Sequence, residues 1–282
     1  MKPYLDLLFK VAMNGEDRND RTGIGTIACF GEFMELDMRN GFPAVTTKRL
    51  AFKQVEAELV AFLRGYDRIE DFHAVGCTIW DGNALESPAW LAHRRFVGDV
   101  GRVYGVQWRR WLSTDNEIPP GTVQVDQLRN VVEAIKKDPH GRRHLVTAWN
   151  PGELDVMCLP PCHYAFQLFA SGSDYLDMLV HMRSVDLVLG LPFDIASYGL
   201  LLHVLAKETH RQPRMLKWSF GDAHIYNNHL EVVDELLNRA PRQLPELAWR
   251  EGAVVGIDTL EPGDAQLLNY DPHPAVKAVL NV

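Results

Sequence analysis

The 282-residue sequence predicts an α+β fold, because segments with helical and strand patterns follow one another irregularly along one chain. Two segments repeat apolar residues at helical spacing, and a third is apolar almost throughout. Five other segments are rich in β-branched and aromatic residues. Helices mixed with a largely antiparallel or mixed sheet are therefore expected. No linker-like tract divides the chain, which predicts one domain over residues 1–282.

Three helices are predicted from hydrophobic spacing. The first has an apolar face made by Phe52, Val55, Leu59 and Phe62. Glu58 lies on this helix, and Gly65 follows where glycine commonly ends one. The second has a face made by Val125, Leu128, Val131, Val132 and Ile135, with Pro139 soon after it. The third, Ile195 to His210, has so few polar residues that we expect it to be buried on most sides.

The expected strands lie between these helices. They are Thr26 to Leu36, His144 to Trp149, His163 to Ala170, Tyr175 to Met182 and Lys217 to Phe220.

Composition excludes several classes of function. Acidic residues outnumber basic ones by 37 to 29, a formal charge of −8, whereas nonspecific nucleic-acid binding needs excess Lys and Arg. No apolar run approaches the ~20 residues that cross a bilayer, so no membrane segment is expected. The four cysteines are irregularly spaced and no signal peptide is evident, which favours the reducing cytoplasm.

Cys162 in LPPCH is a candidate nucleophile, because a histidine adjoins it and two prolines restrict the approaching backbone. An inert structural thiol is the alternative. Cys158, Cys162 and His163 do not complete a tetrahedral ligand set, so no metal is expected. Arginines are frequent around this motif, and their planar fork suits phosphate, although a single arginine is more often half of a surface ion pair.

Several long motifs together resemble the thymidylate synthases: AWNPGEL, LPPCH, MRSVDLVLGLPFDIASY, GDAHIYNNH and YDPHPAVKA. The resemblance runs from RTGIGT to the C-terminus. It implies a homodimeric α+β enzyme that uses 5,10-methylenetetrahydrofolate to place a one-carbon unit on C5 of a pyrimidine nucleotide. Cys162 corresponds to the nucleophile, whose thiolate adds to C6 so that C5 becomes nucleophilic.

The resemblance also implies roles for other residues. Arg21, Arg183 and Ser184 would hold the 5′-phosphate, and Arg142 and Arg143 would reach across from the other subunit. The sugar 3′-hydroxyl would meet His224 and Tyr226. The residues that organise proton-transferring waters would be Glu58, Tyr104 and His163. The folate-binding residues would be Trp80, Asp186, Gly190, Phe193 and Val282.

Asp194 is the most informative departure from the family. Thymidylate synthases read PFNIASY where this chain reads PFDIASY. The asparagine amide matches O4 and N3–H of uracil, whereas a protonated Asp194 would match the N4 amino group and N3 of cytosine, and would donate a proton to N3. The alternative is that residue 194 merely caps a helix beginning at Ile195, since Asp and Asn are similar caps.

Two further departures concern Met182 and Asn83. Met182 opens an MRS sequence that resembles the deoxycytidylate hydroxymethylases, relatives that also carry aspartate at the base. Asn83 stands where thymidylate synthases generally have a tryptophan near the folate. We therefore predict cytidylate specificity, with pterin stacking left open.

The expected reaction is reductive methylation of dCMP to 5-methyl-dCMP and dihydrofolate, because a full-length tail ending at Val282 would exclude water. Hydroxymethylation to 5-hydroxymethyl-dCMP and tetrahydrofolate is the first alternative, and methylation of dUMP is the second. A non-enzymatic role as an RNA-binding or structural dimer is a further alternative. Such an enzyme would suit a virus that modifies its DNA, or a nucleoside natural-product pathway.

Overall fold

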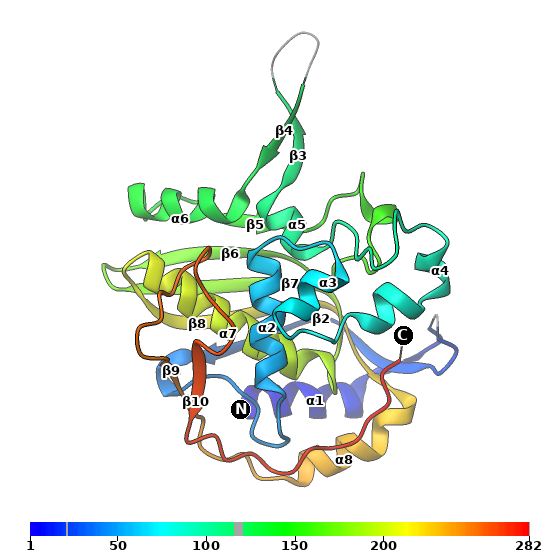
Figure 1. The fold of residues 1–282 in the computed structure, drawn as a ribbon. Helices are drawn as coiled ribbons and strands as arrows, with labels where there is room; N and C mark the ends of the chain where they lie inside the picture. The colour runs from blue at the N-terminus through cyan, green and yellow to red at the C-terminus, as the bar shows by residue number, and fades with distance from the viewer. Residues whose placement is uncertain (21, 116–120, 282) are drawn as a thin grey trace.

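The fold is built around a six-stranded mixed sheet in the order β1-β2-β8-β7-β6-β5 (Figure 1). The computed structural model describes residues 1–20, 22–115 and 121–281. The strands are β1 (Glu16–Arg18), β2 (Thr26–Asp37), β5 (Leu145–Thr147), β6 (His163–Ser171), β7 (Tyr175–Asp186) and β8 (Gln212–Tyr226). β7 and β8 are parallel and the other neighbours antiparallel, which confirms the expected mixed sheet.

The longer helices are α1 (Lys2–Asn14), α2 (Phe52–Leu63), α6 (Gln127–Lys137), α7 (Gly190–Glu208) and α8 (Leu230–Asn238). The short helices are α3 (Ile69–Ala74), α4 (Pro88–Leu91), α5 (Tyr104–Arg109), η1 (Met38–Asn40), η2 (Gly82–Glu86), η3 (Leu154–Val156) and η4 (Asn227–His229). Two small antiparallel pairs complete the fold: β3 (Trp111–Thr114) with β4 (Thr122–Val125), and β9 (Glu246–Trp249) with β10 (Ala265–Leu268). None of the helices among the described residues combines the length and apolarity needed to cross a bilayer.

The first two predicted helices are confirmed, together with the residues that end them, except that Val125 lies in β4 and not on the face of α6. α2 stops at Leu63, and Gly65 adopts the left-handed conformation (φ 64°) that glycine tolerates without strain. α6 begins at a cap in which Asp126 accepts a hydrogen bond from the backbone N–H of Arg129. It ends at Lys137, before Pro139.

The third helix, α7, is buried as predicted but begins five residues earlier than expected. Its cap is Leu189 and its first residue is Gly190. Pro192 lies in the first turn, where proline is tolerated because the backbone N–H groups there have no partner within the helix. Asp194 is therefore an interior helical residue, and the alternative that it is the N-terminal cap is wrong.

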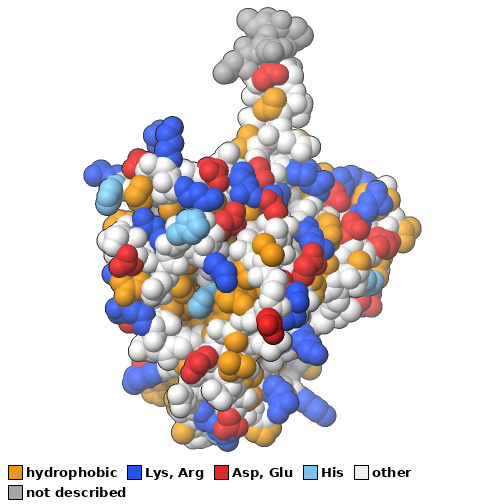
Figure 2. Space-filling view, turned by 60° about the vertical axis from the view of Figure 1, so that its left-hand side comes forward, with side chains coloured by type: hydrophobic (Ala, Val, Ile, Leu, Met, Phe, Trp, Pro, Cys, Tyr) orange, Lys and Arg blue, Asp and Glu red, His pale blue; other side chains and the backbone are white. Residues whose placement is uncertain are grey.

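Among the described residues, helices cover one face of the sheet, and the opposite face carries exposed apolar side chains. α7 packs on β7 and β8, and α1 packs on β2. The opposite face carries the exposed apolar side chains of Phe33, Leu145 and Phe169. The hairpin of β3 and β4 projects away from the rest of the molecule (Figures 1 and 2). On the face in Figure 2, acidic and basic side chains are interspersed.

Candidate active site

Sheet register brings three separate motifs to one edge of the sheet. Because β7 and β8 are parallel, their carboxyl ends lie together, and antiparallel β6 begins at the same edge. His163 pairs with Met182, Ser184 with Asp222, and Asp186 with His224. LPPCH, MRSVD and GDAHIY, far apart in sequence, therefore form one site.

The Cys162 thiol lies beside a fixed arginine. One terminal nitrogen of Arg183 donates to Cys162 Sγ at 3.8 Å, and the guanidinium also donates to the carbonyls of Pro160 and Pro161, both at 2.9 Å. The Cys162 backbone N–H donates to Tyr104 Oη at 2.8 Å. Burial raises the pKa of the thiol, while the Arg183 charge acts in the opposite direction. The two prolines thus supply carbonyl acceptors that hold Arg183 against the sulfur.

His163 is held on two sides. Its ring stacks on Tyr104 with centroids 4.1 Å apart, and its Nδ1 lies 2.8 Å from Tyr198 Oη. Burial lowers the pKa of His163 to about 3, so the imidazole is neutral at physiological pH. Its Nε2 lies 3.7 Å from Asp194 Oδ1, which is too long for a hydrogen bond.

Asp194 is a carboxyl group in surroundings that disfavour its charge. Burial, followed by the negative charges of Glu58 and Asp186, raises its pKa well above the ordinary value. The side chain keeps 16% of its surface exposed, yet protein atoms surround it closely enough for burial to be the largest cause. The surroundings of Asp194 therefore favour its protonated form, and part of the side chain remains exposed.

Glu58 is the second protonatable carboxyl group near the site. It projects from α2 and accepts a hydrogen bond from Trp80 Nε1 at 2.8 Å. Burial raises the pKa of Glu58 to about 7, although the indole hydrogen bond favours the charged form. A carboxyl group that titrates near neutrality suits general acid and base work.

His224 and Tyr226 lie at the end of β8, where the ribose-binding residues are predicted. Asp222 Oδ1 lies 2.8 Å from His224 Nδ1, and the hydrogen bond to this histidine is the largest cause that lowers the pKa of Asp222. Because a carboxylate only accepts, His224 Nδ1 carries a proton, and the bond to Asp222 fixes the orientation of the ring. The contact of His224 with a sugar hydroxyl stays a prediction.

Three of the predicted folate-binding residues lie around the start of α7. Asp186 Oδ1 accepts from the backbone N–H groups of Val188 and Leu189 at 2.8 and 3.3 Å. A Cβ added at Gly190 would lie 3.7 Å from the Asp186 side chain and 3.9 Å from Asp194 Oδ2, which are ordinary contact distances, so Gly190 lies between the two carboxyl groups. Phe193 is partly buried against the core. Their role in folate binding stays a prediction.

Trp80 has little free surface for such a ligand. Its ring is buried, with Phe62, Phe72 and Tyr104 around it. Its role beside folate stays a prediction.

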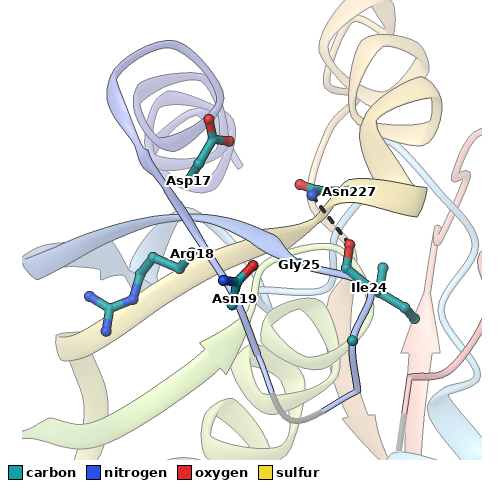
Figure 3. A pocket seen from close by; sticks show the side chains of 7 residues that line it. Asp17, Arg18, Asn19, Ile24, Gly25 and Asn227 are labelled. Atoms are coloured by element: carbon teal, nitrogen blue, oxygen red, sulfur yellow. Dashed lines mark hydrogen bonds between the residues drawn. The ribbon is translucent and has the colours of Figure 1, made fainter.

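Four predicted residues are not brought to this site by the described chain. Arg142 and Arg143 are exposed in the loop before β5, and neither makes an ion pair with any described residue. Arg21 and Val282 lie outside the described residues. The loop around position 21 borders a pocket lined by Asp17, Arg18, Asn19, Gly23, Ile24, Gly25 and Asn227, none of them a predicted catalytic residue (Figure 3).

Sequence reasoning missed residues that support the predicted ones. Tyr198 holds His163, and Asp222 orients His224. Both stand inside the quoted motifs, PFDIASY and GDAHIYNNH, so the signal was the motif itself. A motif does not show which of its residues will form a hydrogen bond with another motif. Tyr198 and His163 are 35 residues apart in the sequence, and only the fold brings them together.

Comparison with known proteins gives concordant results. A family model described as thymidylate synthase matches residues 2–282. A protein named probable thymidylate synthase, from Escherichia phage T5, is 46% identical over 292 aligned residues that cover 100% of both chains.

Proposed function

Because the chain belongs to the thymidylate synthase family, whose members transfer a methyl group from 5,10-methylenetetrahydrofolate to C5 of a pyrimidine nucleotide, we propose that its nucleotide is dCMP. The proposed products are 5-methyl-dCMP and dihydrofolate. The observation that carries this proposal is the interior position of Asp194 in α7, with a pKa raised by burial.

A protonated Asp194 can pair with cytosine through both of its oxygens. One carboxyl oxygen accepts from the N4 amino group, and the O–H donates to N3. Uracil presents the reverse pattern and pairs only when the proton is on the other carboxyl oxygen, the one that faces O4. We expect a site that places the proton on the oxygen facing N3 to select dCMP over dUMP.

The same carboxyl group assists the chemistry. The Cys162 thiolate adds to C6 of the pyrimidine, and electron density moves toward N3. Asp194 stabilises that density by donating its proton to N3, while the Arg183 guanidinium favours the thiolate before the attack. C5 then attacks the one-carbon unit, and the C5 proton is taken by a base that Glu58 and His163 help to organise.

We further propose that the enzyme is a homodimer with shared sites. The sheet face with exposed Phe33, Leu145 and Phe169 supports this, since exposed apolar patches of this kind commonly mark protein interfaces. Arg142 and Arg143, which have no ion-pair partner among the described residues, would bind the phosphate in the partner's site.

Subunit complementation tests the shared site. Cys162→Ala and Arg143→Ala proteins should each be nearly inactive, and a refolded mixture should regain about a quarter of wild-type activity. Half of the dimers in such a mixture are mixed, and each has one intact site. A mixture as inactive as its components would contradict the proposal.

Methylation of dUMP is the second candidate, because the phage T5 relative is named a probable thymidylate synthase. The two are separated by incubating the protein with 5,10-methylenetetrahydrofolate and equimolar dCMP and dUMP, and identifying the products by mass. We expect methylated dCMP with equivalent dihydrofolate, and a reversed preference for Asp194→Asn. Production of dTMP alone by the wild type would overturn the proposed specificity.

A further inference from the structure

The C-terminal tail, residues 273–281, forms hydrogen bonds with the rest of the protein at two places. At the near end, Arg239 donates to the Pro274 carbonyl at 2.7 Å, and the His273 backbone N–H donates to the Thr46 carbonyl at 2.8 Å. At the far end, His229 Nε2 lies 2.8 Å from the Val279 carbonyl. The side-chain amides of Asn228 and Asn281 form a reciprocal pair, with distances of 3.0 and 3.1 Å (donors Asn228 and Asn281, respectively).

Hydrogen bonds supply the last attachments of the tail. Val276 and Ala278 pack against the core, but Val279 and Leu280 beyond them are 68% and 62% exposed, so these two bury little apolar surface. The Asn228–Asn281 pair is itself exposed, and such hydrogen bonds are individually weak in water. The far attachment therefore contributes little stability of its own, so loss of one partner should free this end of the tail.

The turn η4, which binds the far end of the tail, also binds the loop that contains position 21, where a phosphate-binding arginine is predicted. η4 directly follows Tyr226 at the end of β8. Asn227 is its first residue. The Asn227 backbone N–H donates to the Gly25 carbonyl at 3.0 Å, and Nδ2 donates to the Ile24 carbonyl at 3.3 Å (Figure 3). The tail and the loop around position 21 are thus attached to one three-residue turn.

The same turn also lies close to Asp186, a predicted folate-binding residue. His229 is fully buried, and its Nδ1 has no hydrogen-bond partner among the described residues. This nitrogen lies 4.0 Å from Asp186 Oδ1. One imidazole therefore separates the tail carbonyl of Val279 from the carboxylate of Asp186.

We propose that Asn228 and Asn281 are positioning residues that decide the product, because their pairing keeps the tail closed while the one-carbon unit awaits reduction. The proposal rests on the proposed folate-dependent transfer but applies to either base. With the tail closed, a hydride with its two electrons passes from tetrahydrofolate to the exocyclic methylene carbon. The C5=C6 bond re-forms, the Cys162 thiolate leaves, and the oxidised folate releases its N5 proton to give dihydrofolate. With the tail open, water adds its oxygen to that carbon and releases a proton, the thiolate leaves in the same way, and tetrahydrofolate is not oxidised.

The product ratio tests the proposal. Asn281→Ala should raise the ratio of hydroxymethylated to methylated nucleotide about threefold to tenfold, as expected for the loss of a weak pair of hydrogen bonds. Asn228→Ala should do the same, and the double variant should go no further, because the two amides make one interaction. Asn238→Ala is the control, since that side chain donates only to the Asp234 carbonyl on α8. It should leave the ratio unchanged.

Hydrogen exchange of residues 275–281 supplies a readout that needs no turnover. In nucleotide-free and folate-free protein, exchange should be faster in Asn281→Ala than in the wild type or Asn238→Ala. Ratios are measured with dCMP and dUMP in separate tubes, so acceptance of dUMP alone would refute the proposed base and leave this test intact. Equal exchange in all variants, additive effects in the double variant, or a wild type that makes only hydroxymethylated nucleotide would overturn the proposal.

Discussion

Asp194 Oδ1 lies 3.7 Å from His163 Nε2, and burial favours the uncharged form of both groups. The distance alone suggests an ion pair, but burial lowers the pKa of His163 to about 3 and raises that of Asp194 well above its ordinary value. Neither shift has the direction that an ion pair would produce. The Asp194 carboxyl group is therefore not bound to the imidazole by an ion pair.

Asp194→Asn should stabilise the free protein. The raised pKa means that the unfolded chain loses the Asp194 proton at lower pH than the folded protein, so the wild type loses stability as pH rises above the unfolded value near 4. The Asn variant cannot ionise at this position, so its stability does not fall with pH for this reason. Urea unfolding from pH 4 to pH 8 should show a gap in favour of Asn that widens with pH, and a variant less stable at every pH would indicate a structural role.

Glu58→Gln should separate stability from catalysis. Its folded pKa of about 7, against 4.5 unfolded, costs stability progressively between these two values and no more above pH 7. The variant should match the wild type near pH 4 and exceed it by about 3 kcal/mol at pH 8. Its turnover should fall by about 10²-fold or more, because Gln still accepts from Trp80 but transfers no proton. Normal turnover would remove Glu58 from the proton-transfer scheme.

Cys162→Ala should abolish turnover, by about 10⁴-fold or more, while nucleotide binding persists through Arg183. Cys158→Ala is the matched control, because burial raises the pKa of that thiol to about 12 and it has no role in the proposed chemistry. Steady-state rates and calorimetric nucleotide titrations measure the two effects. Substantial turnover by the Cys162 variant would exclude covalent catalysis through this residue.

Asp222→Ala should raise the nucleotide KM about tenfold with little change in kcat, because His224 loses the charged partner that orients it. Asp222→Asn should restore most of the affinity, since an amide oxygen still accepts from Nδ1. A nucleotide without a 3′-hydroxyl should show the same KM with wild type and variant. If the variant raises the KM of that analogue by the same factor, Asp222 affects something other than the contact with the sugar.

Local sequence patterns predicted α2 and α6. Two other helices, α1 and α8, were not predicted, although α1 has local signals of the same kind. α2 and α6 followed from apolar spacing and end where Gly65 and Pro139 indicated. α1 has proline in its first turn and a buried face made by Tyr4, Leu7, Leu8 and Val11.

β8 was predicted as four residues and has fifteen. Its buried positions alternate through Leu216, Trp218 and Phe220 and resume at Ala223, so the period is broken near Gly221. Partners on both sides, β2 and β7, extend the strand beyond what alternation alone supports. Strand length was therefore a tertiary property here.

The order and content of long motifs determined the family, the one-carbon donor and the candidate nucleophile, because chemistry of this kind needs particular residue types. Only the tertiary structure decided that α7 starts at Gly190, that Asp194 is not its cap, and that Asp222, Tyr198 and η4 support the site. These facts depend on burial and on contacts between residues far apart in the sequence. Proton affinities and orientations arise from such surroundings, which no local pattern of residues contains.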